Sequence, residues 1–276
     1  MIVSSARASE ATRALEADAA SVRFHDVGKS FRTSSRGGAR TQVLRDVSFT
    51  VQPGEIVAVV GPSGCGKSTL LRATAGLDTA TEGSVTIDGS PVRDVDPRCA
   101  VGFQEPRLLP WRSITDNVAL GLPRKTPASR GRKRVAELIE LVGLAPHASH
   151  RPGEVSGGMA QRAALARALA RNPRVLLLDE PFGALDALTR LKMQDLLLDL
   201  HRQDPTTVLL VTHDVDEALY LSDHVIVLGR PTPGEPAGIV ESIEVGLPRP
   251  RSREDSDLTR MRGHLLGLLG VDTTAH

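Results

Sequence analysis

The stretch GPSGCGKST, from Gly61 to Thr69, places a lysine and two hydroxyl groups after spaced glycines, in the pattern G-x-x-x-x-G-K-[ST]. It follows the β-branched run at residues 56–60 and leads into a helical pattern at residues 67–77. Backbone N–H groups of such a turn, together with a helix N-terminus, bind phosphate. Lys67 would reach the β- and γ-phosphates of a nucleotide, and Ser68 would offer its hydroxyl to Mg²⁺. The predicted nucleotide-binding residues are Gly61, Pro62, Ser63, Gly64, Cys65, Gly66, Lys67, Ser68 and Thr69.

A second group of polar residues follows apolar runs that read as buried strands. The run VLLLD at residues 175–179 ends in Asp179 and Glu180, and His213 follows the run at residues 207–212. Ligands of open α/β sheets lie at the carboxyl ends of the strands, so these side chains should lie beside the phosphates. We expect Asp179 to hold Mg²⁺ through water, Glu180 to act as general base, and His213 to contact the γ-phosphate. A structural cap of the strand by the two acids is the alternative.

The surrounding pattern predicts the elements that position these residues. Alternating polarity indicates antiparallel strands at residues 21–31 and 42–51, and continuous apolar runs indicate strands buried on both faces. From about residue 106 to 170 the periodicity is helical, and afterwards strands and helices alternate as in parallel βαβ units. We therefore expect an α/β fold with an antiparallel β subdomain and a helical insert. The expected division is a disordered tail at 1–20, with a short Ala-rich helix as the lesser possibility, a domain at 21–246, and an amphipathic tail at 247–276.

Composition excludes several classes of function. Lys and Arg number 34 against 33 Asp and Glu, a net charge of +1, so no overall field recruits nucleic acid or a membrane and any anion site must be local. No apolar run approaches the roughly 20 residues that span a bilayer. The two cysteines, Cys65 and Cys99, are too few for a disulfide framework and favour a reducing compartment. We expect no nucleic-acid partner and a cytosolic location.

The segment VSGGMAQRAALARAL, residues 155–169, resembles the LSGGQ signature of ABC transporter ATPases. The resemblance extends in order over about residues 22–228, with Phe31 as the adenine-stacking aromatic, Gln104 as the Q-loop glutamine, GALD at 183–186 as the D-loop and His213 as the switch histidine. It departs from the family pattern at Phe31, Val155 and Met159, none of which removes a phosphate ligand. The resemblance implies a P-loop NTPase core with a helical ABC-specific subdomain, and it implies ATP and Mg²⁺ as ligands.

The resemblance also implies how the site is assembled. Ser156 should cap a helix whose N-terminus, opened by two glycines, is another anion site. In the family this site closes on ATP held by a second subunit, so two copies would bury two ATP molecules. Catalytic roles fall on Glu180, His213 and Gln104, and metal binding falls on Ser68, Gln104 and Asp179. The residues that would come from the partner subunit are Ser156, Gly157, Gly158, Met159 and Asp186.

The transporter class is favoured over ABC ATPases of translation or DNA repair, because the chain has one cassette and no long coiled-coil insertion. A nucleotide-sensing regulator without turnover is disfavoured because Glu180 is present. The segment FQEPRLLPWRSITDNVALGL, from residue 103, is similar to importers of nitrate, taurine and aliphatic sulfonates. The resemblance implies an energy-coupling ATPase, peripheral on the cytoplasmic face of the inner membrane, with permease subunits and an extracytoplasmic solute-binding protein. Aliphatic sulfonates are expected first, and taurine, nitrate or a thiamine-precursor pyrimidine follow.

Trp111, the single tryptophan, lies in a non-periodic segment bracketed by Pro106 and Pro110. With Leu108 and Leu109 it forms either a local mini-core or a groove for a short helix of the permease. The prolines restrict the backbone, so a shift at Gln104 would move this surface. We expect docking of the permease near Leu108, Leu109 and Trp111.

Overall fold

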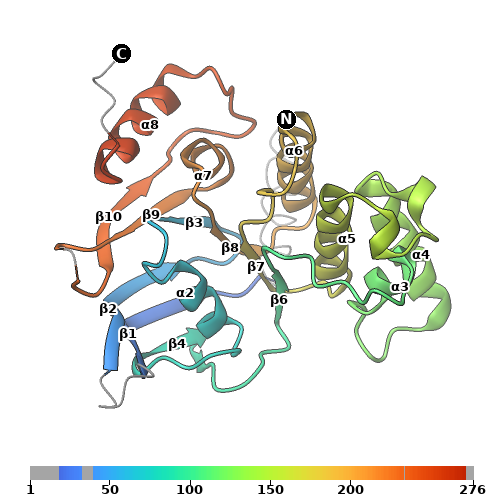
Figure 1. Cartoon of the computed structure of the whole chain (residues 1–276), viewed down its shortest axis with the longest axis horizontal. Helices are drawn as coiled ribbons and strands as arrows, with labels where there is room; N and C mark the ends of the chain where they lie inside the picture. Colours follow the sequence, from blue (N-terminus) through green and yellow to red (C-terminus); the bar gives the residue numbers. More distant parts are fainter. Residues whose placement is uncertain (1–18, 33–39, 233, 272–276) are drawn as a thin grey trace, which may run out of the picture. The chain divides into compact units, whose positions relative to one another are not determined.

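The structure is a computed structural model that describes residues 19–32, 40–232 and 234–271. The chain forms two compact units, the first from residues 1–96 and 205–276 and the second from residues 97–204. The expected disordered tail lies outside the described residues, apart from Ala19 and Ala20, which are buried. Figure 1 shows the elements of both units in the order of the chain.

The first unit contains an antiparallel sheet in the order β2-β1-β4-β5. In β1 the predicted alternation holds from Val22 to His25 and breaks at residues 27–29, which are all buried beside register shifts in the pairing with β2. The rings of Phe24 and Phe49 stack with their centroids 4.3 Å apart. The strands are β1 (Val22–Arg32), β2 (Arg40–Val51), β4 (Glu82–Ile87) and β5 (Ser90–Pro91).

The first unit also contributes four strands in the order β10-β9-β3-β8. β3 (Ile56–Val60) pairs in parallel with β8 (Thr207–Val211) and with β9 (His224–Gly229), and every residue of β3 and β8 is buried. This parallel arrangement confirms the βαβ expectation. β10 (Gly238–Glu244) pairs antiparallel with β9 and was not expected from the sequence, because its alternation is weak and it follows a Pro- and Gly-rich turn.

The C-terminal segment packs on its own unit. Helix α8 (Ser256–Leu268) contacts α7 (Val215–Leu221), and Leu258 and Leu265 of α8 are buried. The ion pair of Arg262 with Asp216, 2.9 Å between Nε and Oδ1, joins α8 to the first turn of α7. The apolar side of this amphipathic tail therefore packs on the domain.

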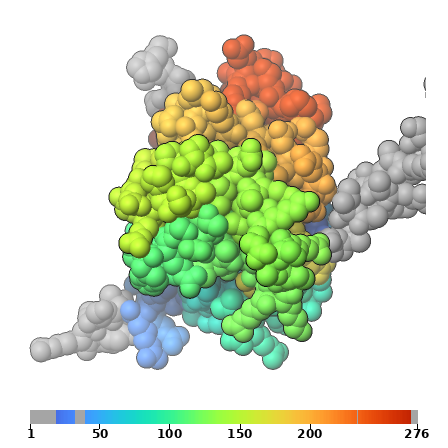
Figure 2. Space-filling view, turned by 90° about the vertical axis from the view of Figure 1, so that its right-hand side faces the viewer, coloured from blue at the N-terminus to red at the C-terminus, as the bar shows by residue number. Residues whose placement is uncertain are grey.

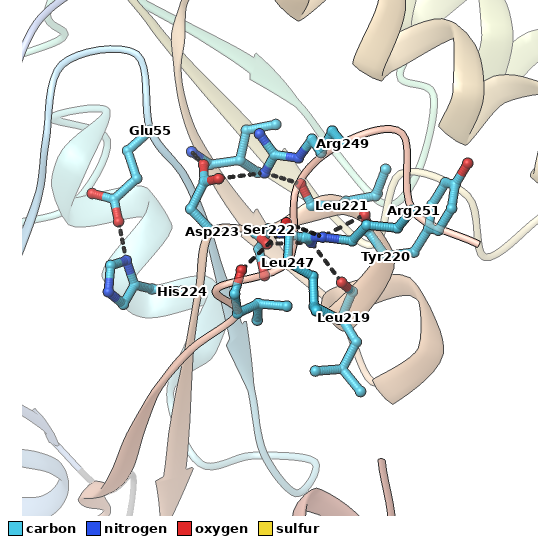
Figure 3. Close-up of polar contacts among 12 residues, drawn as sticks. Glu55, Leu219, Tyr220, Leu221, Ser222, Asp223, His224, Leu247, Arg249 and Arg251 are labelled. Carbon is cyan, nitrogen blue, oxygen red and sulfur yellow. Dashed lines mark hydrogen bonds and ion pairs between the residues drawn. The ribbon is translucent and has the colours of Figure 1, made fainter. Parts of the chain in front are cut away.

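A buried arginine, Arg251, joins the C-terminal segment to the end of α7 by hydrogen bonds. The Arg251 guanidinium donates to the carbonyl oxygens of Leu219 and Ser222 at 2.7 and 2.6 Å, and also to those of Tyr220, Val245 and Leu247 (Figure 3). Carbonyl groups at a helix C-terminus carry partial negative charge, so they serve as partners of the guanidinium in place of a carboxylate. Burial, with a contribution from the charge of Arg249, lowers the pKa of Arg251 to about 10, and the side chain stays charged at neutral pH.

The second unit pairs β6 (Cys99–Gly102) in parallel with β7 (Val175–Asp179). Its helices are α3 (Ile114–Ala119), α4 (Ala128–Leu141), α5 (Gly157–Ala170) and α6 (Ala187–Gln203), with 3-10 turns η1 (Ala145–His147) and η2 (Pro152–Glu154). The helical stretch expected at 106–170 is present as α3 to α5. The compact unit extends beyond that stretch because it also includes β6, β7 and α6. Its helical part, green to yellow-green, faces the viewer in Figure 2.

Within the described part of the chain, no helix has both the length and the apolar character needed to cross a bilayer.

Candidate functional site

The phosphate-binding turn lies between β3 and α2 (Lys67–Thr74), where the sequence placed it. Gly66 caps α2 with a φ of 103°, and a Cβ there would lie 2.6 Å from the side chain of Leu44, so only glycine fits. A Cβ on Gly61 would lie 2.4 Å from the carbonyl oxygen of Leu228. These close approaches explain why two of the three glycine positions of the motif require glycine. The turn keeps its backbone N–H groups at the start of a helix, as anion binding requires.

Lys67 is buried against this turn. Its Nζ donates to the carbonyl oxygens of Gly61 at 2.7 Å and Pro62 at 3.1 Å. Cys65 is also buried, and burial raises the pKa of its thiol, as expected of a side chain that packs within the loop. The ammonium of Lys67 is thus held over the loop that would carry the phosphates.

Arg230 belongs to the same loop, and the sequence did not reveal it. It follows β9, and its Nη2 donates to the carbonyl oxygen of Gly64 at 3.0 Å. A cavity of about 220 Å³ is lined by Pro62, Ser63, Cys65 and Arg230. This arginine adds positive charge to the phosphate-binding turn, and only the tertiary structure identifies it because 166 residues separate it from Gly64.

Phe31 and His213 also belong to the first unit. Phe31 is 42% exposed near the end of β1, and the Nζ of Lys29 lies 5.1 Å from the centre of its ring. An exposed aromatic face of this kind can stack on a base. His213 is exposed between β8 and α7, where Asp214 caps α7 by accepting from the N–H of Glu217 at 3.1 Å.

The acidic pair ends β7 in the second unit. Asp179 is buried, and Glu180 has a φ of 46°, a left-handed conformation that a residue with a Cβ rarely adopts and that is common at functional sites. Gln104, which follows β6, donates from Nε2 to Oε2 of Glu180 at 3.0 Å. The structure therefore brings together the expected general base and the expected Q-loop glutamine, 76 residues apart.

The signature segment caps α5 as expected. The Oγ of Ser156 accepts from the N–H of Met159 at 3.2 Å, and Gly157 has open space where a Cβ would lie. A Cβ on Gly158 would lie 3.2 Å from the side chain of Leu185, so this glycine permits close packing on the D-loop. Asp186 in turn caps α6, and hydrogen bonds with Thr189 lower the pKa of its carboxyl group. The N–H of Met159 is taken by the Ser156 cap, and among the hydrogen bonds of the described residues those of Gly157 and Gly158 have no acceptor, so these two remain open to an anion.

Two residues of α5 hold the Q-loop segment, and neither was singled out from the sequence. Gln161 donates to the carbonyl oxygen of Phe103 at 3.0 Å. Arg167 donates from its two terminal nitrogens to the carbonyl oxygens of Pro106 and Arg107, each at 2.8 Å. Burial lowers the pKa of Arg167. The signature helix is thus bonded to the backbone on both sides of Gln104 and Glu105. Gln161 and Arg167 lie six and twelve residues after the first residue of the motif, and their positions gave no local signal.

The exposed aromatic segment has its own support. The buried side chain of Asn117 in α3 accepts from the N–H of Leu109 at 2.7 Å and donates to the carbonyl oxygens of Leu109, Arg112 and Ser113. Trp111 is 67% exposed, whereas Leu108 and Leu109 are partly buried. The mini-core interpretation is therefore wrong for Trp111. A rigid loop presents an apolar ring to solvent, as a docking site would.

The donor set suits Mg²⁺ and does not suit a metal held by protein alone. Among the described residues no cluster of three or more His, Cys, Asp or Glu side chains could hold a metal. Mg²⁺ uses one or two carboxylates and takes its other ligands from waters and phosphates. A buried carboxylate at Asp179, a hydroxyl at Ser68 and an amide oxygen at Gln104 are hard oxygen donors of that kind.

Comparisons with known proteins agree with this arrangement. A family model described as ABC transporter matches residues 44–183. The chain is 50% identical over 252 residues to the aliphatic sulfonates import ATP-binding protein SsuB 1 of Xanthomonas axonopodis pv. citri, covering 90% of this chain and 96% of that protein. It is 52% identical over 229 residues to SsuB 2 of Burkholderia lata, covering 83% of this chain and 81% of that protein.

A solved structure of the ATP-binding cassette MJ0796, a dimeric post-hydrolysis state bound to ADP and Pi, superposes with a TM-score of 0.71. It is 34% identical, and the match covers 81% of this chain and 98% of that one. Because the family model spans more than half of the chain and the two relatives match it over 96% and 81% of their lengths, the chain belongs to the ABC transporter family, among its ATP-binding proteins.

Proposed function

We propose that this chain is the ATP-hydrolysing subunit that drives import of aliphatic sulfonates, acting at the cytoplasmic face of the inner membrane. The observation that carries the proposal is 50% identity to a sulfonates import ATP-binding protein over 96% of that protein. The chemistry of the site supports the hydrolytic part, because Gln104 is bonded to a carboxylate that ends a buried strand. The partners would be permease subunits, a solute-binding protein and a second copy of the chain.

In this proposal Glu180 takes a proton from the attacking water, and Gln104 keeps the carboxylate of Glu180 oriented. Lys67 exchanges the carbonyl oxygens of Gly61 and Pro62 for the β- and γ-phosphates of ATP, and His213 stabilises the charge that develops on the γ-phosphate. Phe31 stacks on the adenine. Ser68, Gln104 and Asp179 would hold Mg²⁺, which would supply positive charge to the phosphates.

The second copy would complete the site with its signature segment. The open N–H groups at the start of α5 and the hydroxyl of Ser156 suit a γ-phosphate presented by another subunit. Gly157, Gly158, Met159 and Asp186 complete this surface. The related cassette MJ0796 is described as dimeric in two solved structures, one of them with ADP and Pi bound.

The substrate assignment is tested by deleting the gene for this chain. Uptake of a labelled alkanesulfonate should fall to background, and wild-type chain expressed from a plasmid should restore it whereas Lys67→Ala should not. Uptake of sulfate serves as the control and should not change. Unchanged alkanesulfonate uptake in the deletion strain would refute the assignment, and selective loss of taurine, nitrate or pyrimidine uptake would reassign the substrate.

A further inference from the structure

The loop before α4 and the start of that helix concentrate positive charge. No Asp or Glu occurs between Asp116 and Glu137, although the whole chain has a net charge of only +1. We call this the basic segment; its cations are Arg124, Lys125, Arg130, Arg132, Lys133 and Arg134. A local block of one sign, in a chain that is otherwise balanced, creates a field that reaches an external anion.

The fold does not use these charges internally. All six are exposed except Arg134, which is partly buried. Among the described residues the basic segment makes one ion pair, Lys133 with Glu137 at 3.9 Å, and both partners are more than half exposed. Such exposed pairs contribute little to stability. The other five cations are therefore available to a partner outside the chain.

Helix α4 is also charged against its own dipole. It begins at Ala128 without a side-chain cap and without an acidic residue in its first turn, while its first two turns carry four cations. Cations near a helix N-terminus oppose the positive end of the macrodipole. Local stability does not explain this composition, so an external anion is the more direct explanation.

The shape and composition of the basic segment indicate the class of partner. The buried face of α4 is apolar, with Val135, Leu138 and Ile139, so the cations of the helix lie on its exposed side. No Phe, Tyr or Trp occurs between Trp111 and Phe182, so the segment offers no ring on which nucleic-acid bases could stack. An extended anionic surface fits these cations better than a compact ligand or a single strand.

The same compact unit contains the exposed Trp111 and the 44% exposed Leu120, and α3 packs on α4 between them and the basic segment. In Figure 2 the green stretch of the chain, which contains α3 and α4, lies on the face turned to the viewer. A transporter subunit works beside the membrane that holds its permease. We propose that the basic segment binds the anionic phospholipid headgroups of that membrane and thereby helps to hold the helical part of this unit at its surface.

The test is sedimentation of the purified full-length chain with vesicles of phosphatidylcholine alone or with 30% phosphatidylglycerol. The chain should bind only the anionic vesicles, and raising the salt to about 1 M should release it because the Debye length falls to about 3 Å. The variant Arg124→Gln/Lys125→Gln/Arg132→Gln should bind on the order of 100-fold more weakly, since each cation near an anionic surface contributes about five-fold. Its basal ATP hydrolysis should match the wild type.

The matched control is Arg23→Gln/Arg40→Gln/Arg93→Gln, which removes the same charge from exposed positions outside the basic segment and should bind vesicles as the wild type does. Equal binding to neutral and anionic vesicles, or equal losses in the two triple variants, would overturn the proposal. Displacement by millimolar inorganic phosphate would indicate a free-phosphate site, and tighter binding to RNA than to vesicles would indicate a nucleic-acid site; either result contradicts it. None of these outcomes depends on which solute is imported.

Discussion

At the residue scale, the feature that most constrains mechanism is the contact of Gln104 with Glu180. The strained backbone of Glu180 and the amide of Gln104, 3.0 Å from its carboxylate, leave the general base little freedom to reorient. A carboxylate held in this way loses little entropy when it accepts a proton from water. In the proposed mechanism Lys67 contributes charge at the phosphates and exchanges the carbonyl oxygens of Gly61 and Pro62 for them when ATP binds.

Replacing Glu180 with Gln tests the assigned general base. ATP binding should be unchanged, because the amide keeps the shape and the hydrogen bond to Gln104 can be remade by the new side chain. Hydrolysis should fall by about 10²–10⁴-fold, the usual contribution of a general base. Equilibrium nucleotide binding and single-turnover hydrolysis measure the two effects separately. Near-normal turnover would show that another group activates the water.

At the element scale, α5 and α7 connect parts of the chain that are distant in sequence. Through Gln161 and Arg167, α5 holds the Q-loop segment that carries Gln104 and leads to Trp111. The C-terminal segment holds α7 at both ends, through Arg251 at its last carbonyl groups (Figure 3) and through Arg262 at its first turn. Because only Asp214 separates His213 from α7, the tail also stabilises the element next to the proposed switch histidine.

Arg251→Met should lower the free energy of unfolding by about 2–4 kcal/mol, because several buried carbonyl groups lose a charged donor. Thermal and denaturant unfolding of the purified chain measure this change. The control is Arg260→Met on the exposed face of α8, whose ion pair with Asp257 is solvent-exposed and should contribute less than about 0.5 kcal/mol. Equal effects of the two variants would contradict the anchoring role of Arg251.

At the scale of the whole molecule, the proposed function requires a surface through which hydrolysis acts on a permease, and we place that surface on the second unit. Hydrogen bonds support the chain that follows Gln104. Helix α5 bonds to its backbone first, and Asn117 bonds to the loop after that. Trp111 is exposed in the loop that Asn117 holds, although tryptophan is usually largely buried. This arrangement is what docking of a short permease helix would require.

Trp111→Ala should therefore uncouple the two activities. Basal ATPase of the isolated chain should change less than two-fold, since the ring is outside the hydrolytic residues. Transport by the reconstituted complex should fall about ten-fold or more, as expected for an aromatic residue at the centre of an interface. Leu141→Ala, at a similarly exposed apolar position of α4, is the control and should leave transport intact. Parallel loss of ATPase and transport would favour a structural role.

The sequence by itself determined the features that depend on near neighbours in the chain. The spacing of Gly61 to Thr69 fixed the turn, the apolar run before Asp179 fixed a buried strand, and Ser156 fixed a helix start, because caps, turns and buried strands are decided within a few residues. The N-terminal tail lies outside the described residues apart from Ala19 and Ala20, so the expectation that it is disordered stays a prediction.

The tertiary structure alone decided which distant groups meet. Nothing near Gln104 identifies Glu180 as its partner, and Arg230, Gln161, Arg167 and Arg251 act on carbonyl groups that 4 to 166 residues of chain separate from them. A backbone carbonyl carries no side-chain signature, so a bond to it cannot be read from residue types. The exposure of Trp111 was also undecided in sequence, because burial depends on what packs against the ring.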